Sequence, residues 1–322
     1  MTIDDGARLR AACARRAAVQ AHIRGFFAAR GVLEVETPVL SVAANPEPNI
    51  EPFVTAFGGH VAHGPRARWL RPSPEFALKR LLAAGVGDCY ELGRVFRNGE
   101  AGRRHNPEFT MLEWYRVGWD YQRLAQETIE LVRELARAGG REVEVVTCTY
   151  RELFERELGL DPLLAPVERL REALGAVRVD PTGLERDDWL DLLMSHRLQP
   201  RFAPERITLV RDFPATQAAL ARIRDDAVPV AERFELYLGG EELANGYQEL
   251  TAAGEQRARF VRDNARRRAR GQSEVPLDEA LLAALPQLPP CAGVALGVER
   301  LLMWLAGSDD IADVLTFAFA RA

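Results

Sequence analysis

Cationic side chains gather between two apolar segments near residue 100. Residues 89–96 (CYELGRVF) and 109–115 (FTMLEWY) are apolar enough to form strands, and the residues between them include Gly99 and Gly102. This composition predicts two antiparallel strands joined by a long, charged loop. Guanidinium groups bind phosphate oxygens through paired, charge-assisted hydrogen bonds, so such a loop could hold a nucleotide triphosphate. A solvated basic turn is the alternative, and the charges alone leave both open. The cations of the loop are Arg97, Arg103, Arg104 and His105.

A second group of side chains with chemical potential is acidic. One short strand is expected on each side of the turn Gly239-Gly240. In the register that this turn sets, Tyr237 lies opposite Glu242, and Glu235 lies opposite Ala244, so Glu235 and Glu242 share one face. Two adjacent carboxylates repel each other unless a cation lies between them, which suggests Mg²⁺ brought in with phosphates. An exposed acidic edge strand is the alternative.

Strict alternation along the second strand would point Glu249 away from the face of Glu242. A β-bulge within Ala244-Asn245-Gly246 would correct this. It would direct Asn245, Tyr247 and Glu249 into one pocket.

Several of these segments match a known family. FRN at 96–98 followed by RHNPEFTMLEWY at 104–115 resembles motif 2 of class II aminoacyl-tRNA synthetases in its lysyl form. The resemblance continues through SPE at 73–75, ELANGYQEL at 242–250 and GVALGVERLLM at 293–303. Because the chain is short and starts with the catalytic portion, it is most similar to the paralogous ligases that modify elongation factor P. The resemblance implies ATP and Mg²⁺ as cofactors.

The resemblance also assigns roles to the matching residues. It implies that Arg97 and Arg300 are catalytic, and that Arg300 lies over the adenine with Phe109 on the other side. The ATP-binding residues it implies are Arg97, Asn98, Gly99, Asn106, Phe109, Glu242, Leu243, Gly297 and Arg300. The substrate-binding residues it implies are Ser73, Pro74, Glu75, Tyr115, Asn245, Tyr247, Glu249 and Ala295, and the metal ligands are Glu235 and Glu242.

Glu75 would receive an ammonium group of the substrate, and Glu249 with Tyr115 would hold its side-chain ammonium. Ala295 stands where lysyl-tRNA synthetases usually carry glycine, whereas the ligases carry alanine and prefer β-lysine. Gly99 departs from both families, which usually have glutamate there. Either Glu100 or a backbone group would then make that contact with ATP.

The elements before motif 2 are expected to be a helix and a strand. Residues 7–30 repeat apolar residues at helical spacing, and Gly31 stops the helix. Residues 31–40 alternate apolar and acidic residues like a half-buried strand, with Pro38 at its end. This order resembles class II motif 1, which implies a homodimer.

The remaining elements follow from caps and periodicity. Pro74 begins a helix that runs to about Ala84. Residues 121–138 have a clean helical period, and 291–303 predict a strand, a turn at Gly297 and an amphipathic helix. The expected fold is α+β, the class II catalytic core with an antiparallel sheet flanked by helices. We expect a single domain over 1–322 with a helical insertion at about 120–226.

Composition limits the class of partner. The chain has 322 residues, of which 47% are hydrophobic and 28% charged, as in an ordinary globular protein. Its net charge of −5 makes tRNA an unlikely partner, because nucleic-acid binding usually needs a basic excess. Four cysteines lack C-x-x-C spacing, and His60 and His63 lack a third ligand nearby, so no zinc site is expected. The N-terminus has no signal-like apolar core and no stretch has membrane-span length, which predicts a cytoplasmic protein.

The expected function is ATP-dependent activation of (R)-β-lysine or lysine as an aminoacyl adenylate, with transfer to a lysine side chain of elongation factor P. One alternative is a lysyl-tRNA synthetase-like enzyme that charges an RNA. Another is a catalytically silent regulatory paralogue, which the retained Arg97, Glu235, Glu242 and Arg300 disfavour.

Overall fold

The computed structural model describes residues 3–61 and 64–322. The chain divides into two compact units. One consists of residues 1–119 and 250–322, and the other of residues 120–249. Each unit is α+β, with a largely antiparallel sheet flanked by helices, as the sequence predicted.

The first unit contains a sheet with strand order β1-β5-β6-β12 and a three-stranded sheet with order β2-β4-β3. β1 pairs with β5 in parallel, whereas β5, β6 and β12 are antiparallel neighbours. The strands are β1 (Leu33–Glu34), β2 (Leu40–Ser41), β3 (Val54–Ala56), β4 (Ala67–Leu70), β5 (Cys89–Phe96), β6 (Glu108–Val117) and β12 (Cys291–Gly297). The α-helices are α1 (Ile3–Ala28), α2 (Glu75–Ala83), α7 (Ala253–Ala269), α8 (Glu279–Ala284) and α9 (Val298–Ala306).

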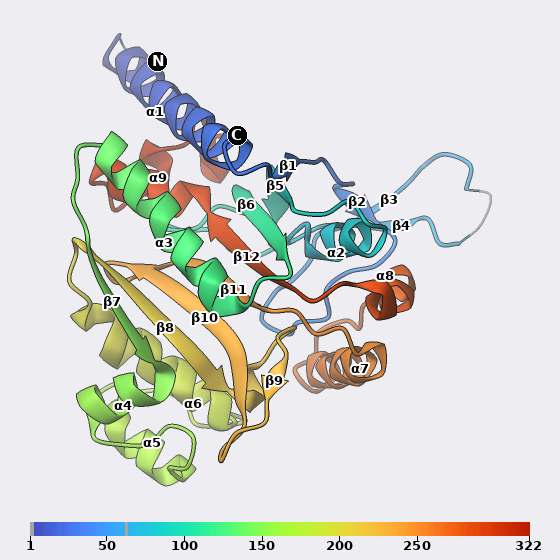
Figure 1. The fold of residues 1–322 in the computed structure, drawn as a ribbon, viewed down its shortest axis with the longest axis vertical. Coiled ribbons are helices and arrows are strands. Elements are labelled where there is room, and N and C mark those ends of the chain that lie inside the picture. The colour runs from blue at the N-terminus through green and yellow to red at the C-terminus, as the bar shows by residue number, and fades with distance from the viewer. Residues whose placement is uncertain (1–2, 62–63) are drawn as a thin grey trace. The chain divides into compact units, whose positions relative to one another are not determined.

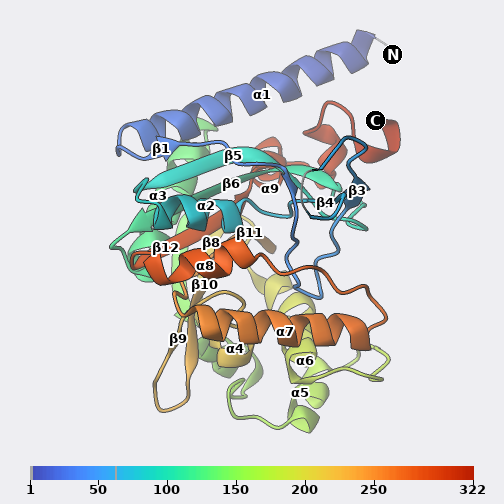
Figure 2. The same cartoon turned by 90° about the vertical axis from the view of Figure 1, so that its right-hand side faces the viewer.

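Strand alternation separates a core face from a polar face in this first unit. On the core face, the ring of Phe27 from α1 stacks on Tyr90 of β5 at 4.4 Å and meets Trp114 of β6 edge-on at 5.4 Å. Tyr90 and Trp114 are cross-strand partners. The next pair, Glu91 and Glu113, must therefore point to the other face. Figure 2 shows α1 on one side of β5 and β6 and α2 on the other.

The long strand predicted for residues 31–40 is wrong. Within that segment the sheet strand β1 spans Leu33–Glu34, and both of its residues are exposed. Beyond it, the N–H of Val35 still donates to the carbonyl of Tyr90, and the carbonyl and the hydroxyl of Thr37 accept from the side chain of Arg71. Leu40 then begins β2, which belongs to the other sheet of this unit. The preceding helix and its end at Gly31, which has φ +66°, are confirmed.

The second unit contains a sheet with order β11-β10-β8-β7, and β9 also pairs with β10. Its strands are β7 (Glu144–Thr149), β8 (Arg206–Pro214), β9 (Ile223–Arg224), β10 (Val230–Leu238) and β11 (Glu241–Gln248). Its α-helices are α3 (Tyr121–Ala138), α4 (Tyr150–Leu158), α5 (Val167–Leu174) and α6 (Arg186–Leu193). The predicted helix at 121–138 is confirmed, and the side chain of Asp120 caps it by accepting from the backbone N–H of Arg123. Figure 1 shows α3 on one side of the strands and α6 on the other.

The core of the second unit joins α4, α5 and α6 to the sheet. Phe154, Leu170 and Leu190 are fully buried there together with Val210 of β8 and Tyr237 of β10. Thr149 and Glu152 form a capping box at the start of α4, which fixes how the chain leaves β7. The side chains on this face of β10 therefore sit on a rigid support.

Candidate active site

Three buried glutamates occupy the polar face of the first unit. Glu91 on β5 lies opposite Glu113 on β6, and Glu75 is the first residue of α2. Glu91 is bound by Arg71 at 2.5 Å, and Glu75 by Lys79 at 2.5 Å. Each of these two carboxylates thus has a buried cationic partner, as buried charges generally require.

Glu113 is held differently. Its oxygens accept from the hydroxyls of Ser73 at 2.7 Å and Tyr115 at 2.8 Å, and these donors carry no charge. Its side chain is buried. Burial, followed by the charge of Glu75, raises the pKa of Glu113 to about 8. A carboxyl group in this setting is suited to an incoming cation, whose charge would favour its ionised form.

The sequence did not single out Glu113, although it singled out Tyr115. The signal was strand alternation: Glu113 precedes Tyr115 by two residues on β6, so both share one face. The structure brings Glu113 together with three residues predicted to bind substrate, namely Ser73, Glu75 and Tyr115.

Ala295 also lies beside Glu113. The two residues are cross-strand partners between β12 and β6. Directly opposite residues have Cβ atoms about 4.5–5.5 Å apart, so the methyl group of Ala295 borders the carboxylate side chain. Any group that approaches Glu113 on this face meets that methyl group.

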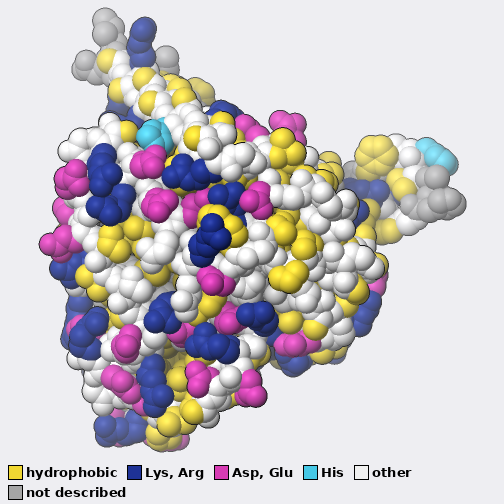
Figure 3. All heavy atoms as spheres, viewed as in Figure 1, with side chains coloured by type: hydrophobic (Ala, Val, Ile, Leu, Met, Phe, Trp, Pro, Cys, Tyr) yellow, Lys and Arg dark blue, Asp and Glu magenta, His cyan; other side chains and the backbone are white. Residues whose placement is uncertain are grey.

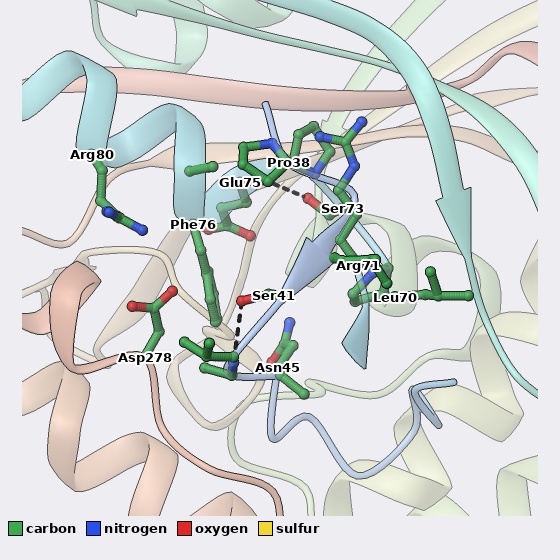
Figure 4. Close-up of a pocket in the computed structure, with 17 residues that line it drawn as sticks. Pro38, Ser41, Asn45, Leu70, Arg71, Ser73, Glu75, Phe76, Arg80 and Asp278 are labelled. Atoms are coloured by element: carbon green, nitrogen blue, oxygen red, sulfur yellow. Dashed lines mark hydrogen bonds between the residues drawn. The ribbon is translucent and has the colours of Figure 1, made fainter. Parts of the chain in front are cut away.

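A cavity of about 230 Å³ lies next to this cluster in the first unit. Ser73, Pro74 and Glu75 line part of it, and Figure 4 shows Phe76, Arg80 and Asp278 around the same space. The rest of its wall is largely apolar and comes from residues 38–45, residues 70–72 and Ala77. The serine of the SPE segment also accepts from the backbone N–H of Glu75 at 3.0 Å, which fixes the start of α2.

The loop between β5 and β6, residues 97–107, carries the predicted nucleotide site. The hairpin itself is confirmed, with Val95 opposite Phe109. The guanidinium of Arg97 lies 5.2 Å from the centre of the Phe109 ring. Its Nε atom is buried and has no hydrogen-bond partner among the described residues. A buried donor without an acceptor carries a desolvation cost, which a phosphate oxygen would remove.

The three residues that follow Arg97 differ in conformation and in partners. Gly99 has φ +82° and open space around its Cβ position, so its left-handed conformation rather than crowding favours glycine. Glu100 lies 3.7 Å from Arg97, where it can interact with the same guanidinium. The N–H of Asn98 donates to the carbonyl of Glu51 at 2.8 Å.

Asn106 is engaged at both ends of its amide. Its Nδ2 donates to the carbonyl of Glu108 at 2.6 Å, and its Oδ1 accepts from the N–H of Phe319 at 2.8 Å. The side chain therefore ties the loop to the C-terminal segment.

Motif 3 forms the strand, turn and helix that the sequence predicted. Gly297 ends β12 and is the N-cap of α9, and Arg300 lies in the first turn of that helix. Arg300 approaches the ring nitrogen Nε2 of His105 at 3.1 Å. Burial and the charge of Arg300 lower the pKa of His105, so its neutral form can accept from the guanidinium. Motif 3 is thus linked to the 97–107 loop.

The acidic hairpin of the second unit has the predicted turn but a different bulge. Tyr237 lies opposite Glu242, as expected. Glu235 lies opposite Asn245 rather than Ala244, because Leu243 is an extra residue on β11. The bulge therefore comes earlier in β11 than predicted, and it still turns Glu249 to the face of Glu242. Continued alternation places Glu242, Asn245, Tyr247 and Glu249 on the face of Glu235.

Arg233 occupies the same face and was not predicted. Its guanidinium pairs with Glu235, donates to Oδ1 of Asn245 at 3.1 Å and donates to the carbonyl of Gln217 at 2.8 Å. Tyr237 also donates to Glu235. Burial raises the pKa of Glu235 to about 7 although Arg233 acts in the opposite direction. The cation expected beside these carboxylates is therefore supplied in part by the chain itself.

Glu249 lies at the end of this strand and is buried. It forms an isolated β-bridge with Ala221. Within the described residues no group of three or more His, Cys, Asp or Glu side chains is arranged to hold a metal ion. His63 lies outside the described residues.

The surface and the helices add two observations. On the face drawn in Figure 3, acidic and basic side chains are interspersed. None of the helices in the described ranges is both long and apolar enough to cross a membrane.

Comparison with known proteins places these motifs in a family. The model of the class II tRNA synthetases (D, K and N) matches residues 5–321. The chain is 47% identical over 312 residues to the elongation factor P--(R)-beta-lysine ligases of Enterobacter sp. (strain 638) and Proteus mirabilis (strain HI4320). It is 46% identical to the protein of that name from Salmonella paratyphi B, and each match covers 96% of this chain and 95% of the relative. This match over nearly the whole chain shows that the protein belongs to the class II tRNA synthetases (D, K and N).

Proposed function

We propose that this protein is an ATP-dependent ligase that activates a lysine and transfers it to a lysine side chain of elongation factor P. The observation that carries the choice of substrate is Glu113. Its buried carboxyl group receives hydrogen bonds from the hydroxyls of Ser73 and Tyr115, whereas the nearby Glu75 and Glu91 have cationic partners. An ammonium group of the substrate would complete this site with a charge.

The substrate roles follow from the same cluster. Glu113 and Tyr115 would receive one ammonium group, and Glu75 would receive the other while it shares the charge of Lys79. The match to the family motif is the basis for proposing that Asn245, Tyr247 and Glu249 also bind substrate. An uncharged analogue would lack the charge that favours the ionised form of Glu113 and the charge-assisted hydrogen bonds to it, which gives the selectivity.

The nucleotide roles begin with Arg97, whose buried Nε suits a phosphate oxygen. By the family resemblance, Phe109 and Arg300 would hold the adenine, and Asn98, Gly99, Leu243 and Gly297 would also contact the nucleotide. Glu235 and Glu242 offer the carboxylate oxygens that Mg²⁺ prefers. Glu235 would exchange its bonds from Arg233 and Tyr237 for the ion, and phosphate oxygens of ATP together with water would supply the remaining ligands. The bound ion would neutralise phosphate charge and orient the leaving group.

The chemistry proceeds in two half-reactions. In the first, a carboxylate oxygen of the substrate attacks the α-phosphorus of ATP in line, and the bond to the β-phosphate breaks, so pyrophosphate leaves. Arg97 stabilises the negative charge that builds up on the phosphate oxygens, and Arg300 positions the nucleotide. In the second, the neutral amine of the acceptor lysine attacks the acyl carbon, AMP leaves, and the nitrogen loses a proton to give an amide.

The relatives are the basis for proposing which protein is the acceptor and which lysine isomer is used. Proteins of similar length and 46–47% identity are named elongation factor P--(R)-beta-lysine ligases. We infer the same acceptor here, (R)-β-lysine as the preferred substrate, and a cytoplasmic location, because a translation factor is modified. We also infer a homodimer from the motif 1 likeness. The exposed apolar side chains of Leu33, Leu40, Val42 and Val54 in that region support the dimer.

The test of the first half-reaction is exchange of labelled pyrophosphate into ATP. The protein alone should catalyse it with (R)-β-lysine, should do so more weakly with lysine, and should not do so with norleucine, which lacks the side-chain ammonium. Equal exchange with norleucine would contradict the role of the buried carboxyl group. Absence of exchange with either lysine isomer would refute the proposed activation step.

A further inference from the structure

The C-terminal segment, residues 308–319, touches the 97–107 loop at two places. The N–H of Ile311 donates to the carbonyl of Arg103 at 2.7 Å. The N–H of Phe319 donates to Oδ1 of Asn106 at 2.8 Å, and the same amide donates from Nδ2 to the carbonyl of Glu108. The loop and the chain end are far apart in sequence, so these contacts are tertiary ties rather than turn geometry.

Two other contacts join the loop to the rest of the first unit, namely Asn98 to the carbonyl of Glu51 and His105 to Arg300. The internal bonds of the loop include Gly102 to the carbonyl of His105 and Ala101 to the carbonyl of Gly99, both at 3.0 Å. Residues 101–105 are exposed. A loop with two glycines and little packing has many conformations, and ordering it when a ligand binds weakens binding. Contacts that order it beforehand therefore strengthen binding.

The C-terminal segment is firmly anchored to the rest of the first unit. Ile311, Val314 and Leu315 are buried. Asp313 accepts from Arg8 of α1 at 2.7 Å. A segment held in this way can impose a conformation on a loop that contacts it.

A second anchor connects this segment to motif 3. Arg16 of α1 donates to the carbonyl of Val314 at 3.1 Å and pairs with Glu299 at 2.8 Å. Glu299 precedes Arg300 and also accepts from the N–H of Thr110 at 2.8 Å. The C-terminal segment, the start of α9 and β6 are thus fixed to one another.

We propose that residues 308–319 form a clamp that holds the 97–107 loop in its ATP-binding conformation, and that Asn106 is the positioning residue through which the clamp acts. The inference rests on the proposed function and deepens it. It also gives Asn106 a different role. Both the Nδ2 and the Oδ1 atoms of its amide, which the family resemblance assigned to ATP, bind backbone groups of Glu108 and of the clamp instead.

The chain offers a matched pair of variants. Phe319→Pro removes the N–H that binds Asn106. The backbone accepts proline there, because Phe319 begins a 3₁₀ turn and Ala318 before it is extended at ψ 158°. Phe319→Ala keeps the N–H and removes a ring that is 61% exposed. The buried anchors of the clamp are untouched in both variants, so both should fold.

Two measurements compare them. In pyrophosphate exchange, Phe319→Pro should raise KM for ATP about fivefold with kcat nearly unchanged, because one net hydrogen bond is lost. Phe319→Ala should behave as wild type. In hydrogen–deuterium exchange without ATP, the amides of residues 98–105 should exchange faster in Phe319→Pro. This second readout does not depend on activity, so it tests the clamp even if the proposed reaction fails.

Combining Phe319→Pro with Asn106→Ala separates positioning from direct contact. If Asn106 acts through the clamp, the double variant has the KM of Asn106→Ala alone. Multiplied effects on KM would show that Asn106 meets ATP independently of the clamp, and would overturn the proposal. Identical KM and exchange rates in Phe319→Pro and Phe319→Ala would overturn it as well.

Discussion

Binding of lysine should depend strongly on pH through Glu113. Burial raises the pKa of this carboxyl group to about 8, so it carries a proton in much of the substrate-free protein at neutral pH. An ammonium group of the substrate requires the ionised form. The affinity for lysine should therefore rise as the pH increases toward 8, and binding below that pH should release a proton.

The magnitude follows from the ionised fraction. For a pKa of about 8, this fraction rises from about 1% at pH 6 to about 50% at pH 8, so the association constant should increase about 50-fold, or about 2 kcal/mol. Isothermal titration calorimetry at pH 6, 7 and 8 measures the affinity. Repeating each titration in two buffers of different ionisation enthalpy counts the protons released.

Glu113→Gln is the informative variant, because glutamine has the same shape but does not titrate. It should bind lysine about 10- to 100-fold more weakly than wild type at pH 8 and should lose the pH dependence. Glu108→Gln is the matched control, since Glu108 lies on the same strand and its side chain is 53% exposed. An affinity that is equal at pH 6 and pH 8 in the wild type would refute the role given to Glu113.

Four further outcomes are expected. Arg97→Ala should abolish pyrophosphate exchange while the thermal unfolding temperature stays close to that of wild type, and undiminished exchange would mean that the phosphate site lies elsewhere. Glu249→Gln should weaken lysine binding by about 1–3 kcal/mol and spare ATP in separate calorimetric titrations, whereas equal loss of both would make Glu249 a nucleotide residue. Ala295→Gly should shift the kcat/KM ratio for adenylation toward α-lysine by about tenfold, because one methyl group is worth about 1–3 kcal/mol, and an unchanged ratio would exclude this residue from isomer selection. Because the pKa of Glu113 is raised from 4.5, its stabilising contribution is complete below pH 4.5 and is lost as the pH rises through about 8. The stability of the substrate-free Glu113→Gln variant should therefore fall less than that of wild type between about pH 4.5 and pH 8 in thermal unfolding, and identical profiles would contradict the raised pKa.

Local pattern was sufficient to predict the hairpins and the long helices. Residues 121–138 form the predicted helix because their apolar period, the Asp120 cap and the terminal glycines all agree. The β5–β6 and β10–β11 hairpins follow from apolar runs that flank a turn. In each case the information lies within a short stretch of sequence.

The features that sequence missed depend on distant partners. The strand expected at 31–40 is limited to Leu33–Glu34, and the bonds from Arg71 to Thr37 that follow it cannot be read from periodicity. The bulge at Leu243 is one choice among several positions that would restore the same face. The bond between the Asn106 amide and Phe319, 213 residues away, was also outside the reach of the sequence, and the ATP-binding role given to Asn106 stays a prediction.

The site residues divide in the same way. Tyr115 was predicted by motif, and alternation alone would have added Glu113. The structure was needed to find the partners of the two carboxyl groups. Glu75 pairs with Lys79, whereas Glu113 accepts from two hydroxyls. This difference in partners is what distinguishes the carboxyl group that is suited to a substrate ammonium.

The central claim is that the activated lysine goes to a protein side chain. Purified elongation factor P should be incubated with the enzyme, ATP and (R)-β-lysine, and its intact mass measured, with tRNA offered in a parallel reaction. We expect elongation factor P to gain the mass of one lysyl group on a lysine side chain, and the tRNA to remain uncharged. An unchanged elongation factor P together with charged tRNA would contradict the account.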